Sequence, residues 1–141
     1  MKRTSAFYII KNVMENYKNL KYNQSIEIET DVNDPVVINE LLKAQAKTKY
    51  VLATLSKTMS DIQHEYKTEG KEIYFFVFSQ HYIIGKSYES IAEEKNISER
   101  TARKYTAEIL QSIAIKMFGI DALDIGGGSY AEDMQDVSQD I

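Results

Sequence analysis

One stretch of the sequence constrains the fold more than any other, because residues 36 to 69 contain neither glycine nor proline. Asp34 can cap a helix whose first position is Pro35, where the missing N–H of proline does no harm. From there to about Lys67, side chains of a coiled-coil-like seam recur at steps of three and four residues, with a polar step in the middle. The pattern predicts one helix about 45 Å long at 1.5 Å per residue. The seam consists of Ile38, Leu41, Gln45, Thr48, Leu52, Leu55, Met59, Ile62 and Tyr66.

This seam requires a packing partner, and the sequence allows two. It can pack against a helix near the N-terminus of the same chain, or against a second copy of the protein. A helix of about 45 Å is longer than a compact monomer of this size needs. We therefore favour self-association as a homodimer, while the intramolecular alternative stays open.

Three other segments have less decisive patterns. Residues 5 to 22 place apolar side chains at steps of three and four, which predicts an amphipathic helix. Residues 25 to 30 alternate apolar and polar side chains, which suits a short strand or an extended linker. Residues 71 to 85 (KEIYFFVFSQHYIIG) place apolar residues on one helical face, but their β-branched and aromatic content also suits a buried strand. The residue pattern alone leaves the last two segments open.

The composition is that of a soluble globular protein. With 141 residues, of which 43% are hydrophobic and 27% charged, the chain can form one ordinary domain or a small domain with a helical extension. It has no cysteine, which excludes disulfides, thiolate metal sites and a cysteine nucleophile. The run IYFFVF at 73 to 78 is too short to span a membrane, and Lys11 interrupts the N-terminal apolar run too early for a secretion signal. We expect a cytoplasmic protein with no membrane partner.

The net charge of −4 is unevenly distributed along the chain. Residues 121 to 141 contain six acidic residues and no lysine or arginine, whereas the remaining residues, with 17 basic and 15 acidic side chains, carry +2. The three consecutive glycines at 126 to 128 and the polar composition around them predict a disordered acidic tail. The acidic overall charge therefore does not exclude a nucleic-acid partner for the rest of the chain.

Residues 87 to 105 (SYESIAEEKNISERTARKY) combine two helix-start signals with a tight turn. Ser87 and Ser98 can each cap a helix, and Asn96 between them tolerates a left-handed backbone conformation. Ile91 and Ala92 form the apolar side of the first helix, where the small alanine lets the second helix approach closely. These features predict a helix-turn-helix.

The second helix of this pair carries exposed cations in its first turns. Arginine can pair with guanine in a major groove about 12 Å wide, and capped N-terminal N–H groups can hold a phosphate. Cations on a helix surface are usually only solvated, so it is their combination with the turn signals that favours DNA binding. The candidate DNA-binding residues are Ser98, Glu99, Arg100, Thr101, Arg103 and Lys104.

The segment HYIIGKSYESIAEEKNISERTARKYTAEILQSIAIKMFG, residues 81 to 119, also carries a family resemblance. Through YIIGKSY, IAEE and ISERTARKY it resembles the C-terminal helix-turn-helix of phage transcription regulators of the ArpU and RinA type, and more distantly region 4 of sigma factors. The resemblance covers residues 73 to 118. Two positions depart from the pattern, because Lys95 stands where such modules usually have leucine and Ala102 where valine is common.

The resemblance implies an all-helical domain that binds promoter DNA and controls late phage or prophage genes together with RNA polymerase. It also favours a helix for residues 73 to 78. The recognition role that it implies falls on Ser98, Glu99, Arg100, Arg103 and Lys104.

The sequence gives little indication of an enzyme. Its two histidines, His64 and His81, do not have a spacing that assembles a site with carboxylates, and we interpret both as structural. The GGGS segment at 126 to 129 is not a phosphate-binding loop, since no strand precedes it and no Lys-Ser/Thr pair follows. We expect no enzymatic activity, no metal and no cofactor.

We therefore expect an all-α protein with N-terminal amphipathic helices, a long connecting helix and a C-terminal helix-turn-helix bundle. Residues 1 to 67 form a helical oligomerisation region, 68 to 120 the DNA-binding domain and 121 to 141 the acidic tail. The expected function is sequence-specific binding of duplex DNA to regulate transcription. Two alternatives are a subunit of a phage DNA-packaging machine, of the small-terminase type, and a module that contacts polymerase or a sigma factor without touching DNA.

Overall fold

All regular secondary structure is helical in the residues that the computed structural model describes, 2 to 31 and 34 to 125. This confirms the expected fold class. No helix in that part of the chain is long and apolar enough to cross a membrane. In chain order the elements are α1 (Ser5–Glu15), α2 (Tyr17–Ser25), α3 (Pro35–Thr68), α4 (Glu72–Ser79), a π-helical turn η1 (Gln80–Ile84), α5 (Tyr88–Lys95), α6 (Glu99–Phe118) and a 3-10 turn η2 (Gly119–Ala122).

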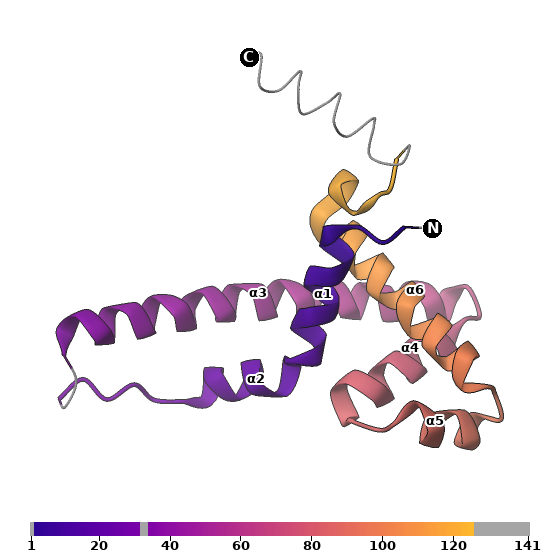
Figure 1. Cartoon of the computed structure of the whole chain (residues 1–141), viewed down its shortest axis with the longest axis horizontal. Coiled ribbons are helices and arrows are strands. Elements are labelled where there is room, and N and C mark those ends of the chain that lie inside the picture. The colour runs from indigo at the N-terminus through magenta and orange to yellow at the C-terminus, as the bar shows by residue number, and fades with distance from the viewer. Residues whose placement is uncertain (1, 32–33, 126–141) are drawn as a thin grey trace, which may run out of the picture.

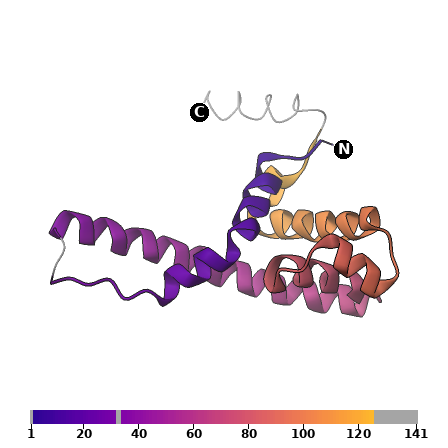
Figure 2. The same cartoon turned by 60° about the horizontal axis from the view of Figure 1, so that its bottom comes forward.

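The longest element, α3, runs the length of the molecule (Figures 1 and 2), and α2, α4 and α6 pack against it. Its start follows the sequence prediction, because the Asp34 carboxylate accepts a hydrogen bond of 2.8 Å from the Val36 N–H. At its end Gly70 adopts a φ of 75°, which lets the Lys71 N–H reach the carbonyl of Tyr66 at 2.7 Å. The first half of α3 extends beyond the other helices, accompanied by α2 and the linker that follows it.

The N-terminal segment forms two helices, so the prediction of one helix over residues 5 to 22 is wrong at Asn16. This residue leaves the helical conformation, with φ −108° and ψ 13°, and its side-chain amide donates to the carbonyl of Asn12 at 2.8 Å. The break lets α1 pack against α6 while α2 lies along α3. Residues 26 to 29 have no regular secondary structure, which makes them an extended linker and not a strand.

One hydrophobic core joins α1, α3, α4 and α6. The seam of α3 contributes to it from Leu52 to Tyr66, so this half of the seam packs within the chain, whereas Leu41 remains 45% exposed. Residues 1 to 67 and 68 to 120 thus share a core and do not form separately packed regions. The largest fully buried side chains of this core are Ile10, Met14, Leu55, Ile62, Phe78, Ile109 and Ile113.

The folded part also extends past residue 120, where we placed the start of the tail. Ala122 is fully buried, and its carbonyl accepts hydrogen bonds from the Thr4 hydroxyl at 3.2 Å and the Gln111 side-chain amide at 3.0 Å. These bonds join the end of the fold to its beginning. Most of the predicted acidic tail, residues 126 to 141, lies outside the described residues.

Candidate nucleic-acid interface

Three helices, α4, α5 and α6, surround a second, smaller core. Its centre consists of Val77 from α4, Ile91 from α5 and Ala102 from α6, each with no exposed surface. The segment 72 to 79, for which the residue pattern left helix and strand open, is therefore a helix that supports the other two. Contacts in this core hold α5 against α6 and α6 against α4.

The turn between α5 and α6 has the local structure that the sequence predicts. Ser87 caps α5 by accepting from the Ser90 N–H at 3.1 Å, and Asn96 ends it with a left-handed φ of 55°. The Ile97 N–H then bonds back to the Ala92 carbonyl at 3.0 Å, which closes the turn. Ser98 begins α6 immediately afterwards.

Five of the six candidate DNA-binding residues are exposed. Ser98 and Glu99 stand at the start of α6, and the cations of its first two turns follow, whereas Ala102 between them is fully buried. Thr101 is half-buried and belongs to the cap, because its N–H and hydroxyl lie 3.0 and 2.9 Å from the Ser98 hydroxyl. The leading end of α6 thus presents a cationic surface, which we define as Arg100, Arg103 and Lys104.

A stack of side chains behind this surface holds Arg103. Its guanidinium lies 4.5 Å from the centroid of the Tyr88 ring, and this ring stacks on His81 at 3.9 Å with the planes 19° apart. His81 is itself fixed, because its Nδ1 lies 2.9 Å from the Lys86 carbonyl, which can only accept. Three separate elements contribute to this stack, so no local sequence pattern pointed to it.

The rest of α6 is anchored to α3 and α4. The Tyr105 ring stacks on Tyr74 at 3.9 Å, and the Tyr66 hydroxyl donates to Glu108 at 3.2 Å and lies 3.0 Å from the Ser112 hydroxyl. Burial raises the pKa of Tyr66 above its usual value, and the nearby Glu108 carboxylate raises it further. The hydroxyl therefore remains a hydrogen-bond donor at neutral pH.

The cationic surface ends at α5, whose exposed side is largely acidic. Glu89, Glu93 and Glu94 are exposed there, and Glu94 pairs with Lys86 at 3.5 Å. Lys95, which stands where modules of this kind usually have a leucine, lies at the surface with its ammonium 4.2 Å from the centre of the Phe76 ring. The exposed cations on either side of the turn are therefore Lys95, at the end of α5, and the three of the cationic surface.

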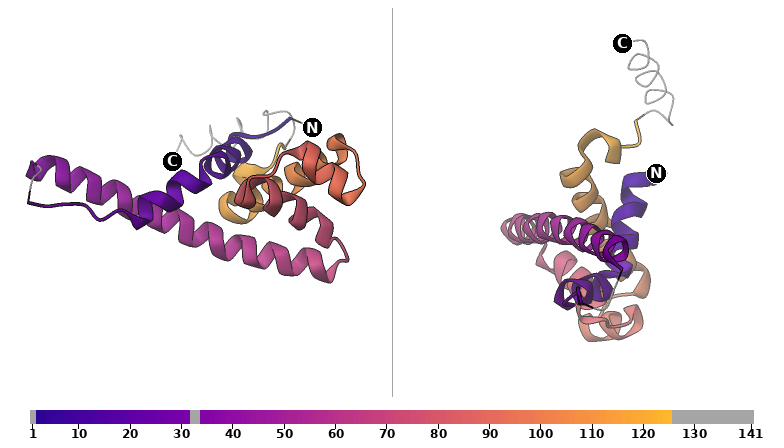
Figure 3. Two further views of the ribbon diagram at one scale, coloured as in Figure 1. Left: turned by 90° about the horizontal axis from the view of Figure 1, so that it is seen from below. Right: turned by 90° about the vertical axis from the view of Figure 1, so that its left-hand side faces the viewer.

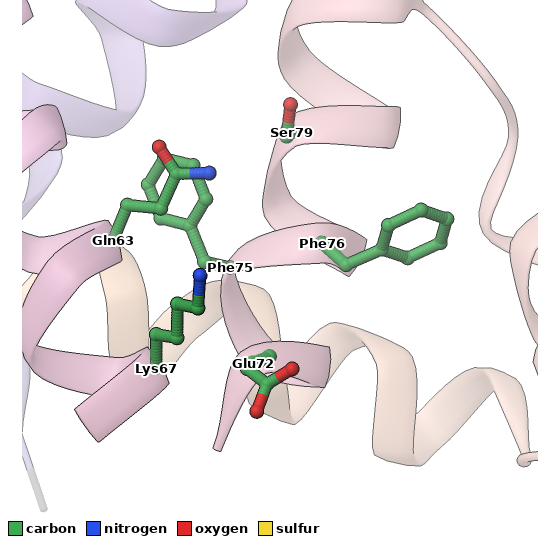
Figure 4. Close-up of a pocket in the computed structure, with 6 residues that line it drawn as sticks. All are labelled: Gln63, Lys67, Glu72, Phe75, Phe76 and Ser79. Atoms are coloured by element: carbon green, nitrogen blue, oxygen red, sulfur yellow. The ribbon is translucent and has the colours of Figure 1, made fainter. Parts of the chain in front are cut away.

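A surface pocket lies between the end of α3 and α4 (Figure 4). Glu72 is the one carboxylate among its lining residues, so the pocket has no pair of acids for general acid–base chemistry. In the described part of the chain, histidines and carboxylates form no group of three that could hold a metal ion. The pocket is lined by Gln63, Lys67, Glu72, Phe75, Phe76 and Ser79.

Comparisons of the chain with models of protein families, with curated proteins and with solved structures found no match.

Proposed function

We propose that the protein binds duplex DNA sequence-specifically through the leading end of α6 and thereby regulates transcription. The observation that carries the proposal is the arrangement of the first two turns of α6. Arg100, Arg103 and Lys104 are exposed there, while Ala102 and the residues after it anchor the same helix in two cores. A DNA-reading helix requires both properties, because its side chains have to reach base edges from a fixed position.

The arrangement suggests a role for each group. Arg103, held over Tyr88, is the candidate for a bidentate contact with guanine O6 and N7. Arg100 and Lys104 flank it and suit phosphate contacts, which position the protein on the duplex without reading sequence. The N-terminal N–H groups of α6 that the Ser98 cap leaves free suit a further phosphate.

Regulation of transcription is the part of the proposal that depends on the family resemblance. Residues 73 to 118 resemble the DNA-binding module of ArpU and RinA type phage regulators, and promoter binding together with RNA polymerase follows from that resemblance alone. The DNA-binding part of the proposal stands without it, on the exposed cations and the capped turn.

The test compares DNA affinity across a series of salt concentrations. Wild-type protein, assayed on duplexes selected from a random pool, should lose affinity as salt increases. The Arg100, Arg103 and Lys104 triple alanine variant should bind much more weakly, with a log–log salt slope that is smaller by about 0.9 for each phosphate contact removed. Arg103→Ala alone should weaken binding by about 1 to 3 kcal/mol and relax the preference at one base pair.

A matched control removes three exposed lysines from elsewhere in the chain. Lys2, Lys21 and Lys67 lie before α1, on α2 and in the last turn of α3, and their triple alanine variant has the same change in net charge as the α6 variant. If the two triple variants bind equally well, general charge attraction explains the binding and the assignment to α6 is wrong. If the wild-type protein binds no duplex from the pool, the DNA-binding function itself is wrong.

A further inference from the structure

The first half of α3, residues 35 to 51, which we call the arm, exposes apolar side chains along its length. Figure 3 shows the arm extending from the packed helices, with α2 and the linker beside it. At 1.5 Å per residue the arm is about 25 Å long. Consecutive exposed apolar residues of this kind are unusual on a helix that has no further partner. The most exposed of them are Val36, Val37, Leu41, Leu42 and Tyr50.

One face of the arm has the spacing of a heptad seam. Successive residues of a helix are about 100° apart, so side chains that follow Val37 at steps of four and three lie on one face of the helix. Continued towards the C-terminus, the same steps lead to the buried Leu55. Thr48 contributes its methyl group to this face, because its hydroxyl donates to the Ala44 carbonyl at 3.1 Å. The arm seam consists of Val37, Leu41, Ala44, Thr48 and Val51.

The linker covers the neighbouring face and leaves the arm seam accessible. Gln45 is the residue that attaches the linker, since its side-chain amide donates to the carbonyls of Asn23 and Ile26, each at 2.8 Å. Val37 and Leu41 nevertheless remain 49% and 45% exposed. The chain itself therefore leaves about half of these two side chains in contact with solvent.

Charge is segregated between the outer end of the arm, with the linker before it, and the inner end of the arm. Residues 26 to 42, which comprise the linker and the start of the arm, contain five acidic residues and no basic one, with Glu40 as the acid on the arm itself, and residues 43 to 60 contain four lysines and no acidic residue. Two arms that pair in an antiparallel orientation place each acidic segment beside the other's basic segment. Parallel pairing would instead place like charges together.

One pair of residues defines how the two antiparallel arms align along their length. Glu40 and Lys47 are seven residues apart, so both lie on the same flank of the arm seam. In a symmetric antiparallel pair that crosses near Ala44, Glu40 of each copy lies beside Lys47 of the other, which forms the contact twice. Glu40 pairs with Lys43 of its own helix at 3.7 Å, but both side chains are more than 60% exposed, and such a pair exchanges readily.

We propose that the arm is a dimer interface, at which a second copy of this chain packs antiparallel along the arm seam. The choice of a second copy follows from the charge pattern, because the same arm turned by a two-fold axis is complementary in charge to the first. This inference goes beyond the proposed DNA binding and does not depend on it, since dimerisation is measured without DNA.

Charge-reversal variants test this alignment of the two arms. Their molar mass is measured by sedimentation over a range of micromolar protein concentrations. The wild type should be a dimer at the upper end of that range. Glu40→Lys and Lys47→Glu should each weaken dimerisation by about ten-fold or more, because each replaces two attractive contacts with two repulsive ones. An equimolar mixture of the two variants should restore the dimer, since every contact in the mixed pair is again between opposite charges.

Both substituted side chains are exposed, so circular dichroism should show an unchanged fold. Asn39→Lys is the matched control, because it adds positive charge to the exposed side of the same helical turn, away from the seam, and should leave the dimer intact. A wild type that stays monomeric throughout the range would overturn the interface. A mixture that fails to restore the mass, or single variants that dimerise normally, would overturn the antiparallel register.

Discussion

The Arg103 guanidinium lies 4.5 Å from the centre of the Tyr88 ring, so the first helix of the pair determines where a cation of the second helix is held. The contact crosses the turn at Asn96 and sits behind the exposed surface of α6. Arginine stacked on an aromatic ring retains its hydrogen-bond donors at the edge of the guanidinium. The stack therefore orients Arg103 without using the groups that would contact a base.

Replacing Tyr88 should lower DNA affinity only when Arg103 is present. Tyr88→Leu removes the ring but keeps an apolar side chain, and an exposed cation–π contact contributes about 0.5 to 1 kcal/mol. We expect affinity to fall by about that amount in the wild type and to stay unchanged in an Arg103→Ala background, as measured in a double-mutant cycle. Tyr88→Phe keeps the ring and should bind normally. Equal losses in both backgrounds would mean that Tyr88 acts through general packing.

Two substitutions at Ser98 should separate stability from DNA binding. Ser98→Ala removes the cap that accepts from Thr101 and should lower the free energy of unfolding by about 1 kcal/mol in urea titrations. Ser98→Asp keeps a capping oxygen and should preserve stability, but its carboxylate would repel a phosphate at the start of α6. Its DNA affinity should therefore fall while its unfolding midpoint stays close to that of wild type. If the Ser98→Asp variant binds as tightly as wild type, the DNA lies elsewhere on the protein.

Stability should decrease at alkaline pH because of two buried tyrosines. Burial raises the pKa values of Tyr66 and Tyr82 above the ordinary value of 10.0, so the folded chain keeps these protons while the unfolded chain loses them. The contribution of these two tyrosines to the free energy of unfolding is complete below about pH 10. It is lost as the pH rises from there towards their pKa values in the folded chain. Tyr82→Phe cannot ionise, so its unfolding free energy should decline less steeply in this range. An identical decline in both proteins would exclude Tyr82 as a cause.

The predictions that the structure confirms depend on interactions within a few residues. Asp34, Ser87 and Ser98 cap helices because each oxygen bonds to an N–H two or three residues ahead, and Asn96 closes a turn by its own backbone preference. Such interactions are properties of short segments. A sequence pattern can therefore predict them with no knowledge of the surrounding structure.

What could not be predicted depends on segments far apart in the chain. The break at Asn16 accompanies the different packing partners of α1 and α2, and Ala122 joins the fold through Thr4, 118 residues away. Periodicity identified the seam of α3 but not its partner, so it did not distinguish the buried Leu55 from the exposed Leu41. The placement of Arg103 on Tyr88 likewise requires the turn geometry, which the residue types alone do not specify.

The uninterrupted course of α3 also limits how the sequence could change. Its 34 residues form a rod of about 51 Å that links the arm at one end to the helices that carry α6 at the other. Inserting one residue into its middle would rotate the two ends by about 100° relative to each other, whereas inserting seven would leave a rotation of only about 20°. Length variation in α3 should thus be tolerated in steps close to a whole number of turns, such as about seven or eleven residues, since these keep both ends facing nearly their original directions.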